Sequence, residues 1–295
     1  MFKIGKLFHL THVVDDLDAM DEWYDDVFAV HRFYRGYEKL AGREASLLTI
    51  GDVVLEPMMP ARVEELRNPS VKRFHDRFGQ HFHSIAWYVD DVDDISRRLD
   101  GEHLRLYNLV GKQVQPPHGV TAIWTHPKET HGQLEFAVYA DFIKDPRFEP
   151  GWSAAAWREH PLGIEGASHI GVVVRELPAA QRLYCDVLGG ALIHTEHDDD
   201  GRRAFVAVGE DTVVELVEPA SSTSRAGQDL ERNGDGIHSL IFKTADLGRA
   251  REHLVAKGLS PEPDGADTIV LGPEQAFGMV VGFTQSVLPN DRRGE

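Results

Sequence analysis

His9-Leu-Thr-His-Val-Val-Asp-Asp16-Leu-Asp-Ala-Met-Asp-Glu-Trp-Tyr24 aligns without a gap with His169-Ile-Gly-Val-Val-Val-Arg-Glu176-Leu-Pro-Ala-Ala-Gln-Arg-Leu-Tyr184. Both stretches begin with the apolar run of a β-strand and continue with the spacing of an amphipathic helix. An acidic residue suited to helix capping, Asp16 or Glu176, stands between the two patterns. The alignment therefore predicts a strand–helix unit that the chain uses at least twice.

The same pattern occurs two more times. It starts at Ser84-Ile-Ala-Trp-Tyr-Val-Asp-Asp91 and at Ser239-Leu-Ile-Phe-Lys-Thr-Ala-Asp246. Short β-like runs follow each helix, most clearly after the third, where an Asp200-Gly201 pair predicts a hairpin turn. The sequence thus predicts an α+β fold made of four βαβββ modules.

The modules fall into two pairs. We expect a first domain at residues 1–142, a linker at 143–163 that is rich in Pro and Gly, a second domain at 164–287, and a frayed tail at 288–295. With 295 residues, of which 42% are hydrophobic, the chain is long enough for two buried cores.

Composition narrows the classes of function. The formal net charge of -17 would repel phosphate backbones, so nucleic acid is not an expected partner. No apolar run reaches membrane-spanning length and no signal peptide is evident, so we expect a cytoplasmic protein without a membrane partner. The single cysteine, Cys185, excludes an internal disulfide and a cysteine-based zinc site.

Three further stretches carry a family resemblance: Val54-Leu-Glu-Pro-Met-Met-Pro60, Val214-Glu-Leu-Val-Glu-Pro219 and His126-Pro-Lys-Glu-Thr-His-Gly-Gln-Leu-Glu135. With the four strand-to-helix starts, they make the chain resemble the vicinal-oxygen-chelate (VOC) superfamily of glyoxalase, bleomycin-resistance and extradiol-dioxygenase-like proteins. The resemblance implies that two modules form one open barrel around a metal, and hence two VOC domains. The last stretch looks most like methylmalonyl-CoA epimerase, whereas two barrels in one chain look like type I extradiol dioxygenases.

A metal site is expected in the first barrel. Period-two alternation directs Leu10 and Val14 toward the helix and His9 into the barrel. The resemblance places metal ligands at His9 and at Glu56. Alternation also directs Glu135 inward, and a buried carboxylate there needs a cation or hydrogen bonds.

The second histidine of the family pattern is displaced. Ser84 stands at that position and His83 one residue earlier, so His83 completes the set His9, Glu56, His83 and Glu135 only if its strand bulges. Ser84 would instead hold a water or a substrate oxygen. Thr11, on the inward face, and Tyr88 are the other substrate-binding candidates, although Tyr88, Trp87 and Trp124 are also compatible with a core.

The second barrel has its own candidates. His169, Glu215 and His238 occupy positions that match His9, Glu56 and His83. Its last strand, residues 278–283, carries no carboxylate, so we expect this barrel to be degenerate and the first to be active, with the reverse left open. His118, His126 and His131 lie in turn-rich stretches near the first barrel, where both surface and gating roles remain open.

For the chemistry, the resemblance implies a divalent ion, Mn, Co, Ni, Zn or Mg, that binds adjacent oxygens of a small-molecule substrate. Such an ion acidifies the neighbouring C–H, and Glu56 or Glu135 would move the proton through a metal-bound enolate, as in an isomerase, an epimerase or a glyoxalase-like lyase. The first alternative is an Fe(II) extradiol dioxygenase, which needs an open third position and would be favoured if Glu56 pointed away.

The second alternative is a metal-free sequestering protein of the bleomycin-resistance type, for which Ser84 and Ser239 at ligand positions are the support. Under every hypothesis the expected partner is a small molecule, and a homodimer is left open.

Overall fold

The computed structural model describes residues 2–63, 66–140 and 143–293. The expected boundary at residue 142 and the last two residues of the tail lie outside these ranges. The first domain contains β1 (Ile4–Val13), α1 (Leu17–Phe28), β2 (His31–Glu38), β3 (Arg43–Ile50), β4 (Val53–Pro60), α2 (Ser70–Phe78), β5 (His81–Val89), α3 (Val92–Gly101), β6 (Leu106–Tyr107), β7 (Gln113–Val114), β8 (Ala122–Thr125) and β9 (Gln133–Ala137).

The second domain repeats this order after a short 3-10 turn, η1 (Pro146–Phe148), and α4 (Ala155–Glu159). It contains β10 (Ile164–Val173), α5 (Leu177–Gln181) continued by a π-helical segment η2 (Arg182–Val187), β11 (Ala191–Asp198), β12 (Gly201–Val208), β13 (Thr212–Pro219), α6 (Arg225–Asn233), β14 (Gly236–Thr244), α7 (Leu247–Ala256), β15 (Glu262–Pro263), β16 (Thr268–Leu271) and β17 (Val280–Thr284).

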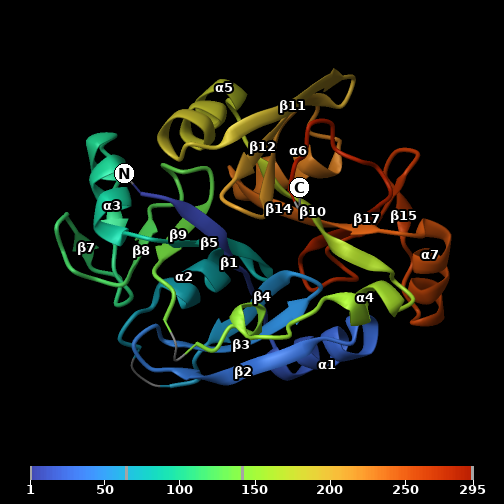
Figure 1. Ribbon diagram of the computed structural model, residues 1–295, viewed down its shortest axis with the longest axis horizontal. Helices are drawn as coiled ribbons and strands as arrows, with labels where there is room; N and C mark the ends of the chain where they lie inside the picture. Colours follow the sequence, from blue (N-terminus) through green and yellow to red (C-terminus); the bar gives the residue numbers. More distant parts are fainter. Residues whose placement is uncertain (1, 64–65, 141–142, 294–295) are drawn as a thin grey trace.

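Each domain is built on one sheet whose first and second modules meet at its centre. The strand order is β2-β3-β4-β1-β5-β9-β8-β6-β7 in the first domain and β11-β12-β13-β10-β14-β17-β16-β15 in the second (Figure 1). In both, the first strand of the domain pairs antiparallel with the first strand of the second module. The predicted α+β fold of four βαβββ modules is confirmed, with helices α2 and α6 inserted between modules as an addition.

Helix capping follows the expectation in the first module and departs from it in the third. The side chain of Asp16 accepts hydrogen bonds from the backbone of Asp18 and Ala19, which closes the first turn of α1. Glu176 precedes α5 but forms no side-chain cap. The prediction that Glu176 caps its helix was therefore wrong, and Pro178, which needs no hydrogen-bond partner for its nitrogen, stands in the first turn instead.

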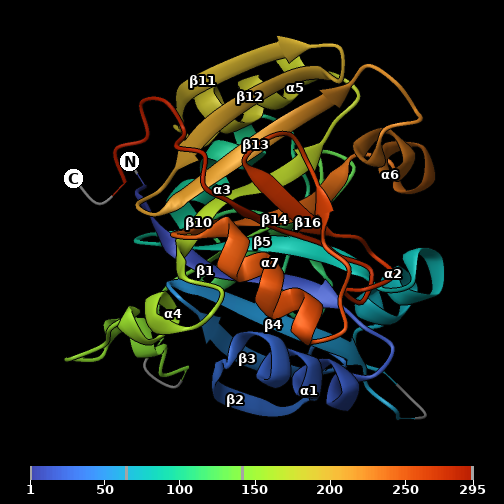
Figure 2. The same ribbon diagram turned by 90° about the vertical axis from the view of Figure 1, so that its right-hand side faces the viewer.

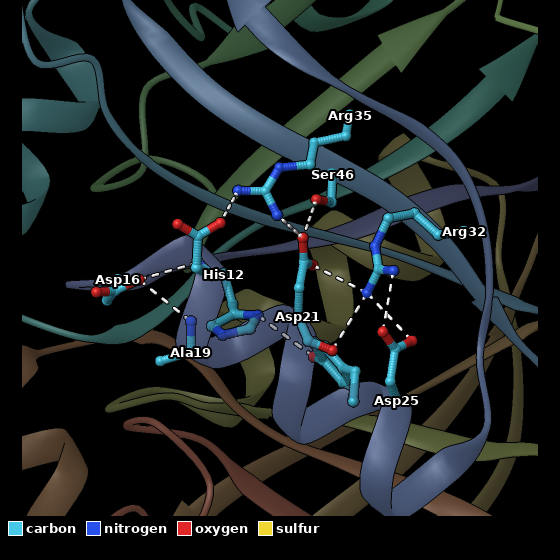
Figure 3. A network of polar contacts seen from close by, with 10 residues as sticks. His12, Asp16, Ala19, Asp21, Asp25, Arg32, Arg35 and Ser46 are labelled. Carbon is cyan, nitrogen blue, oxygen red and sulfur yellow. Dashed lines mark hydrogen bonds and ion pairs between the residues drawn. The ribbon is translucent and has the colours of Figure 1, made fainter.

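A polar network holds α1 to the edge of the first sheet. Figure 3 shows Asp21 of α1 between Arg32, Arg35 and Ser46 of β2 and β3. Asp21 is buried, and the hydroxyl of Ser46 donates to it at 2.8 Å. A buried carboxylate is costly without such partners, so this network makes the position of α1 specific.

The two domains share one hydrophobic core. Phe28 at the end of α1 packs against Phe242 of β14 and Phe283 of β17 in the other domain. The backbone NH of Leu7 in β1 donates to the Asp211 side chain at 2.7 Å, so a turn of the second domain closes the start of the first sheet. Figure 2 shows the two sheets stacked with α7 in front of them. The two domains therefore pack against each other through a continuous hydrophobic core.

The linker and the tail are each held to a sheet by an arginine that pairs with a nearby aspartate and donates to backbone carbonyls. Arg147 forms an ion pair with Asp145 and donates to the carbonyls of Leu7 and Phe8. Arg293 does the same in the second domain. It forms an ion pair with Asp291 and donates to the carbonyls of Ala167 and Ser168 in β10. Arg293 thus satisfies carbonyl groups of the second sheet, while the expected fraying of the tail stays a prediction.

Candidate functional site

Three of the predicted side chains meet inside the first barrel. His9 Nε2 of β1 lies 3.3 Å from Glu56 Oε2 of β4 and 3.2 Å from Glu135 Oε2 of β9. Each of the three residues is at most 3% exposed. Alternation along the strands explains their meeting, since β1 is hydrogen-bonded to β4, and β5 lies between β1 and β9. The predicted inward orientation of His9, Glu56 and Glu135 agrees with the structure.

Two residues that the sequence analysis did not select hold the carboxylates in place. Arg43 of β3 forms an ion pair with Glu56 Oε1 at 2.9 Å. The indole NH of Trp124 in β8 donates to Glu135 Oε2 at 2.8 Å. Burial raises the pKa of Glu56 and outweighs the charge of Arg43, which acts in the opposite direction. Glu56 Oε2 remains buried without a hydrogen-bond partner.

His83 reaches the inner side of the barrel through a bulge. Thr11 is paired with Ser84 and His12 with Phe82, so the register shifts and His83 is the extra residue of β5. Its imidazole stands edge-on to Phe74 of α2, with ring centroids 4.7 Å apart, and its Nδ1 lies 3.2 Å from Ser84 Oγ. Burial, with the nearby charge of Arg43, lowers the pKa of His83 to about 3. A role of His83 as a metal ligand stays a prediction.

The other substrate-binding candidates lie off the cavity that the barrel opens into. Thr11 and Ser84 are buried and hydrogen-bonded to each other. Tyr88 stacks on Phe8 with centroids 4.5 Å apart and donates to Asp145 at 3.3 Å, which makes it part of the anchored linker. None of the three is among the described residues that line the cavity, so direct substrate contact by Tyr88 is not what this geometry favours.

A cavity of about 850 Å³ lies next to the group formed by His9, Glu56 and Glu135. Arg43, His83 and Trp124 line it on the side of the barrel, whereas His9, Glu56 and Glu135 lie behind them. His126 and His131, for which the sequence left the role open, both line it. One wall is contributed by the second domain, from residues 175–179 and 229–237. The cavity is thus a joint product of both domains.

The second barrel contains a looser version of the same arrangement. His169 Nε2 lies 3.4 Å from Glu215 Oε2, and Arg203 of β12 lies 3.5 Å from Glu215 Oε1. Burial raises the pKa of Glu215 to about 7. His238, also at a register shift of its strand, is turned to Asp229 of α6 at 2.8 Å. The three candidate ligands of this barrel are therefore not brought together.

The donors of the first barrel fit a divalent ion in type and spacing. Neighbouring octahedral ligands, each about 2.1–2.3 Å from an ion, lie about 3.0–3.3 Å apart, which is the range of the two separations around His9. Two carboxylates face one guanidinium, so a buried negative charge is left over, and the unpartnered Glu56 Oε2 borders the place where a cation would compensate it. Within the described residues, however, no group of three or more His, Cys, Asp and Glu side chains is already arranged to hold a metal.

Arg43 and Trp124 are the site residues that sequence reasoning missed. The repeat gave no signal for Arg43, since Arg43 lies opposite Pro60 whereas Gly201 lies opposite the matching Pro219. Trp124 was considered as a residue that lines a cleft or packs in a core, and not as a hydrogen-bond partner of Glu135.

A family model and a curated relative match parts of this chain. The model of the Glyoxalase/Bleomycin resistance protein/Dioxygenase superfamily matches residues 6–145 and 166–272. The uncharacterized protein YqjC of Bacillus subtilis (strain 168) is 34% identical over 76 residues, which are 25% of this chain, and the chain spans about half (54%) of the length of that relative.

A solved structure is similar in fold over nearly the whole chain, and another aligns with part of it. A triple mutant of 4-hydroxymandelate synthase from Streptomyces coelicolor aligns with 98% of this chain and 95% of its own, with a TM-score of 0.67 and 12% identity, a likeness that concerns the fold alone. Methylmalonyl-CoA epimerase from Mycobacterium tuberculosis aligns with 41% of this chain and 87% of its own, at 26% identity and a TM-score of 0.38. Among the described residues, no helix is both long and apolar enough to cross a membrane.

Proposed function

Because this chain belongs to the Glyoxalase/Bleomycin resistance protein/Dioxygenase superfamily, we propose that its first domain is a divalent-metal-dependent enzyme that moves a proton on a small molecule with adjacent oxygens. The observation that carries the proposal is the group His9, Glu56 and Glu135, whose donor atoms lie at ligand-like separations and are buried behind the lining of the cavity. The reaction class is that of an isomerase, an epimerase or a glyoxalase-like lyase.

His9 Nε2, Glu56 Oε2 and Glu135 Oε2 would hold the ion. When bound, it would supply Lewis-acid polarisation of a substrate carbonyl. Arg43 takes the other oxygen of Glu56 and so keeps Oε2 directed at His9. The indole NH of Trp124 donates to Glu135 Oε2 itself, the oxygen that lies beside His9. Burial raises the pKa of Glu56 in the ion-free site and keeps water away from the carboxylate. Glu56 or Glu135 would move the substrate proton.

The orientation of Glu56 bears on the dioxygenase alternative. A ring-cleaving dioxygenase needs a third open position beside two histidines and one carboxylate. Glu56 points toward His9 rather than away, and His83 is engaged with Ser84. This arrangement supports redox-neutral proton transfer over oxygen chemistry.

One observation favours the metal-free binding protein as a second candidate. The cavity is lined by Arg43, His83 and Trp124, which separate it from the carboxylates, so a ligand could be held without reaching Glu56 or Glu135. Under this hypothesis Arg43 neutralises Glu56 permanently and no ion is taken up.

The internal repeat provides a matched control for a test of metal binding in the first barrel. We expect the purified protein to bind a divalent ion, and Glu56→Gln and Glu135→Gln to weaken that binding by at least the roughly tenfold expected for loss of an outer partner. Glu215→Gln, at the position in the second barrel that matches Glu56, should leave it unchanged. Affinities are measured by titration of chelator-treated protein, with elemental analysis of the purified protein.

Two results would contradict the proposal. Unchanged metal content in Glu135→Gln together with a loss in Glu215→Gln would move the site to the second barrel. If no divalent ion binds, and chelator alters neither stability nor ligand binding, the metal-free binding protein replaces the enzyme.

A further inference from the structure

The cavity above the first barrel carries cations that the proposed proton transfer does not use. Arg73 and Arg77 of α2 and Lys128 of the β8–β9 turn line it and are exposed. Within the described residues no carboxylate forms an ion pair with any of the three. In a chain with a formal net charge of -17, such a group of uncompensated cations around one cavity is not a consequence of composition.

Helix α2 presents these cations together with aromatic rings. Its sequence Arg73-Phe74-His75-Asp76-Arg77-Phe78 repeats an Arg-Phe pair after four residues, which brings like residues to neighbouring positions on the helix surface. The rings of Phe74 and Phe78 lie 4.7 Å apart, and the Arg77 guanidinium lies 4.8 Å from the centre of the Phe78 ring. The helix therefore offers the cavity a surface that is both cationic and apolar.

Two of the acidic groups of the cavity are already compensated. Asp229 accepts hydrogen bonds from His81 and His238, and Asp235 pairs with His131 at 2.7 Å. The remaining acid in the lining is Glu176. Against Glu176, the three cations Arg73, Arg77 and Lys128 leave the described lining of the cavity with an excess of positive charge.

The matching helix of the second domain lacks this surface. Figure 2 shows α2 and α6 on the same side of the molecule, and α6 contributes Asp229 and Asn233 to the wall opposite. Its sequence Arg225-Ala-Gly-Gln-Asp-Leu-Glu-Arg-Asn233 contains no aromatic residue. The cationic and aromatic surface is therefore specific to the first barrel and not a general property of the repeat.

We propose that this cavity binds a small amphipathic anion, whose carboxylate or phosphate is held by Arg73, Arg77 and Lys128 and whose ring-sized apolar body packs on Phe74, Phe78 and Trp124. This assignment rests on the proposed function, because it names the substrate class of the same site. The volume of about 850 Å³ is in the range of small-molecule sites and accommodates a ligand larger than a simple anion. Guanidinium groups bind carboxylate and phosphate oxygens through paired hydrogen bonds.

The test is a calorimetric titration of the full chain with four probes: 2-naphthoate, 2-naphthyl phosphate, the neutral 2-naphthamide and inorganic phosphate. We expect both naphthyl anions to bind roughly tenfold or more tightly than the amide and than inorganic phosphate, and to weaken with salt. The tighter of the two naphthyl anions identifies the anionic group as carboxylate or phosphate. Arg73→Gln and Arg77→Gln should each weaken anion binding roughly tenfold and leave amide binding unchanged.

Arg158→Gln is the matched control, because Arg158 is an exposed arginine of α4 that does not line the cavity. The titrations are repeated on chelator-treated protein and on Glu135→Gln, since the cations of α2 do not depend on a metal. Anion binding that persists there while metal binding fails would remove the proposed enzyme but not this site. Equal affinity for 2-naphthoate and 2-naphthamide, no binding of any probe, or equal effects of Arg77→Gln and Arg158→Gln would overturn the assignment.

Discussion

Arginine and glutamate meet in both barrels, but with different consequences for the carboxylate. Arg43 approaches Glu56 to 2.9 Å, whereas Arg203 stays 3.5 Å from Glu215. Arg203 is shared with Asp198, which binds it at 2.8 Å. The weaker compensation leaves burial dominant, and the pKa of Glu215 rises to about 7.

Glu215 should therefore make stability depend on pH. Its folded pKa lies above the ordinary value of 4.5, so the folded state binds the extra proton between these values and loses stability as pH rises through that window, by at most about 1.4 kcal/mol per pH unit. In Glu215→Gln this loss should be absent. Urea unfolding of both chelator-treated proteins at about pH 5 and about pH 8 measures the difference. An identical pH dependence of the two proteins would contradict the raised pKa.

At the scale of single residues, period-two alternation predicts toward which face of a strand a side chain points, but not which side chains of other strands it contacts. It directed His9, Glu56 and Glu135 into the barrel, because side chains of a strand alternate between two faces. It could not select Arg43 and Trp124, since which inward residues of different strands touch depends on the register and curvature of the whole sheet.

Among the elements, the connecting segment and the tail depend on buried arginines. Asp145 is fully buried and Arg147 nearly so, and the guanidinium also donates to the carbonyls of Leu7, Phe8 and Asp52. In the second domain the Asp291–Arg293 pair is about 18% exposed. Removal of a buried partner leaves its charge unpaired, whereas water can compensate at the more exposed pair.

Arg147→Ala should consequently destabilise the protein by roughly 3–5 kcal/mol, the range for breaking a buried ion pair. We expect Arg293→Ala to cost clearly less, because solvent reaches Asp291. Chemical denaturation of the two variants and the parent protein gives both values. Equal losses, or a loss below about 1 kcal/mol for Arg147→Ala, would show that the anchors do not act through burial.

The bulge in β5 is another feature of an element that the sequence left undecided. The sequence placed His83 on the helix side under strict alternation and on the inner side if the strand bulged. The structure has the register shift, so His83 lines the cavity. A single extra residue changes the face of a side chain, and no local signal in His81-Phe-His-Ser84 announces it.

On the scale of the whole molecule, contacts across the domains build one wall of the cavity. His81 of β5 lies 3.0 Å from Asp229 of α6, in the other domain. Burial would lower the pKa of His81, but the hydrogen bond and charge of Asp229 outweigh it and raise this pKa above 6.5. For Asp229, hydrogen bonds from His238 and His81 outweigh burial and lower its pKa well below the ordinary range.

Asp229→Asn should accordingly lower the free energy of unfolding most in mildly acidic solution. The contribution of His81 is fully present below its unfolded pKa of about 6.5 and is lost as pH rises through the raised folded value. That of Asp229 is present above an unfolded pKa of about 3.8 and is lost below it. Unfolding free energies of parent and variant, compared between about pH 5 and about pH 9, should converge toward high pH. A constant difference would exclude the ionised pair as its source.

The sequence by itself determined the repeat, the α+β fold of four modules, and the inward direction of the three candidate ligands. These features depend on local patterns, namely apolar periodicity and the starts of helices, which each segment carries in its own residues. Only the tertiary structure decided that Arg43 and Trp124 hold the carboxylates, that a bulge turns His83 inward, and that α6 closes the cavity. Each of these depends on how segments far apart in the chain meet, and pairing across a sheet or between domains is not encoded in any single segment.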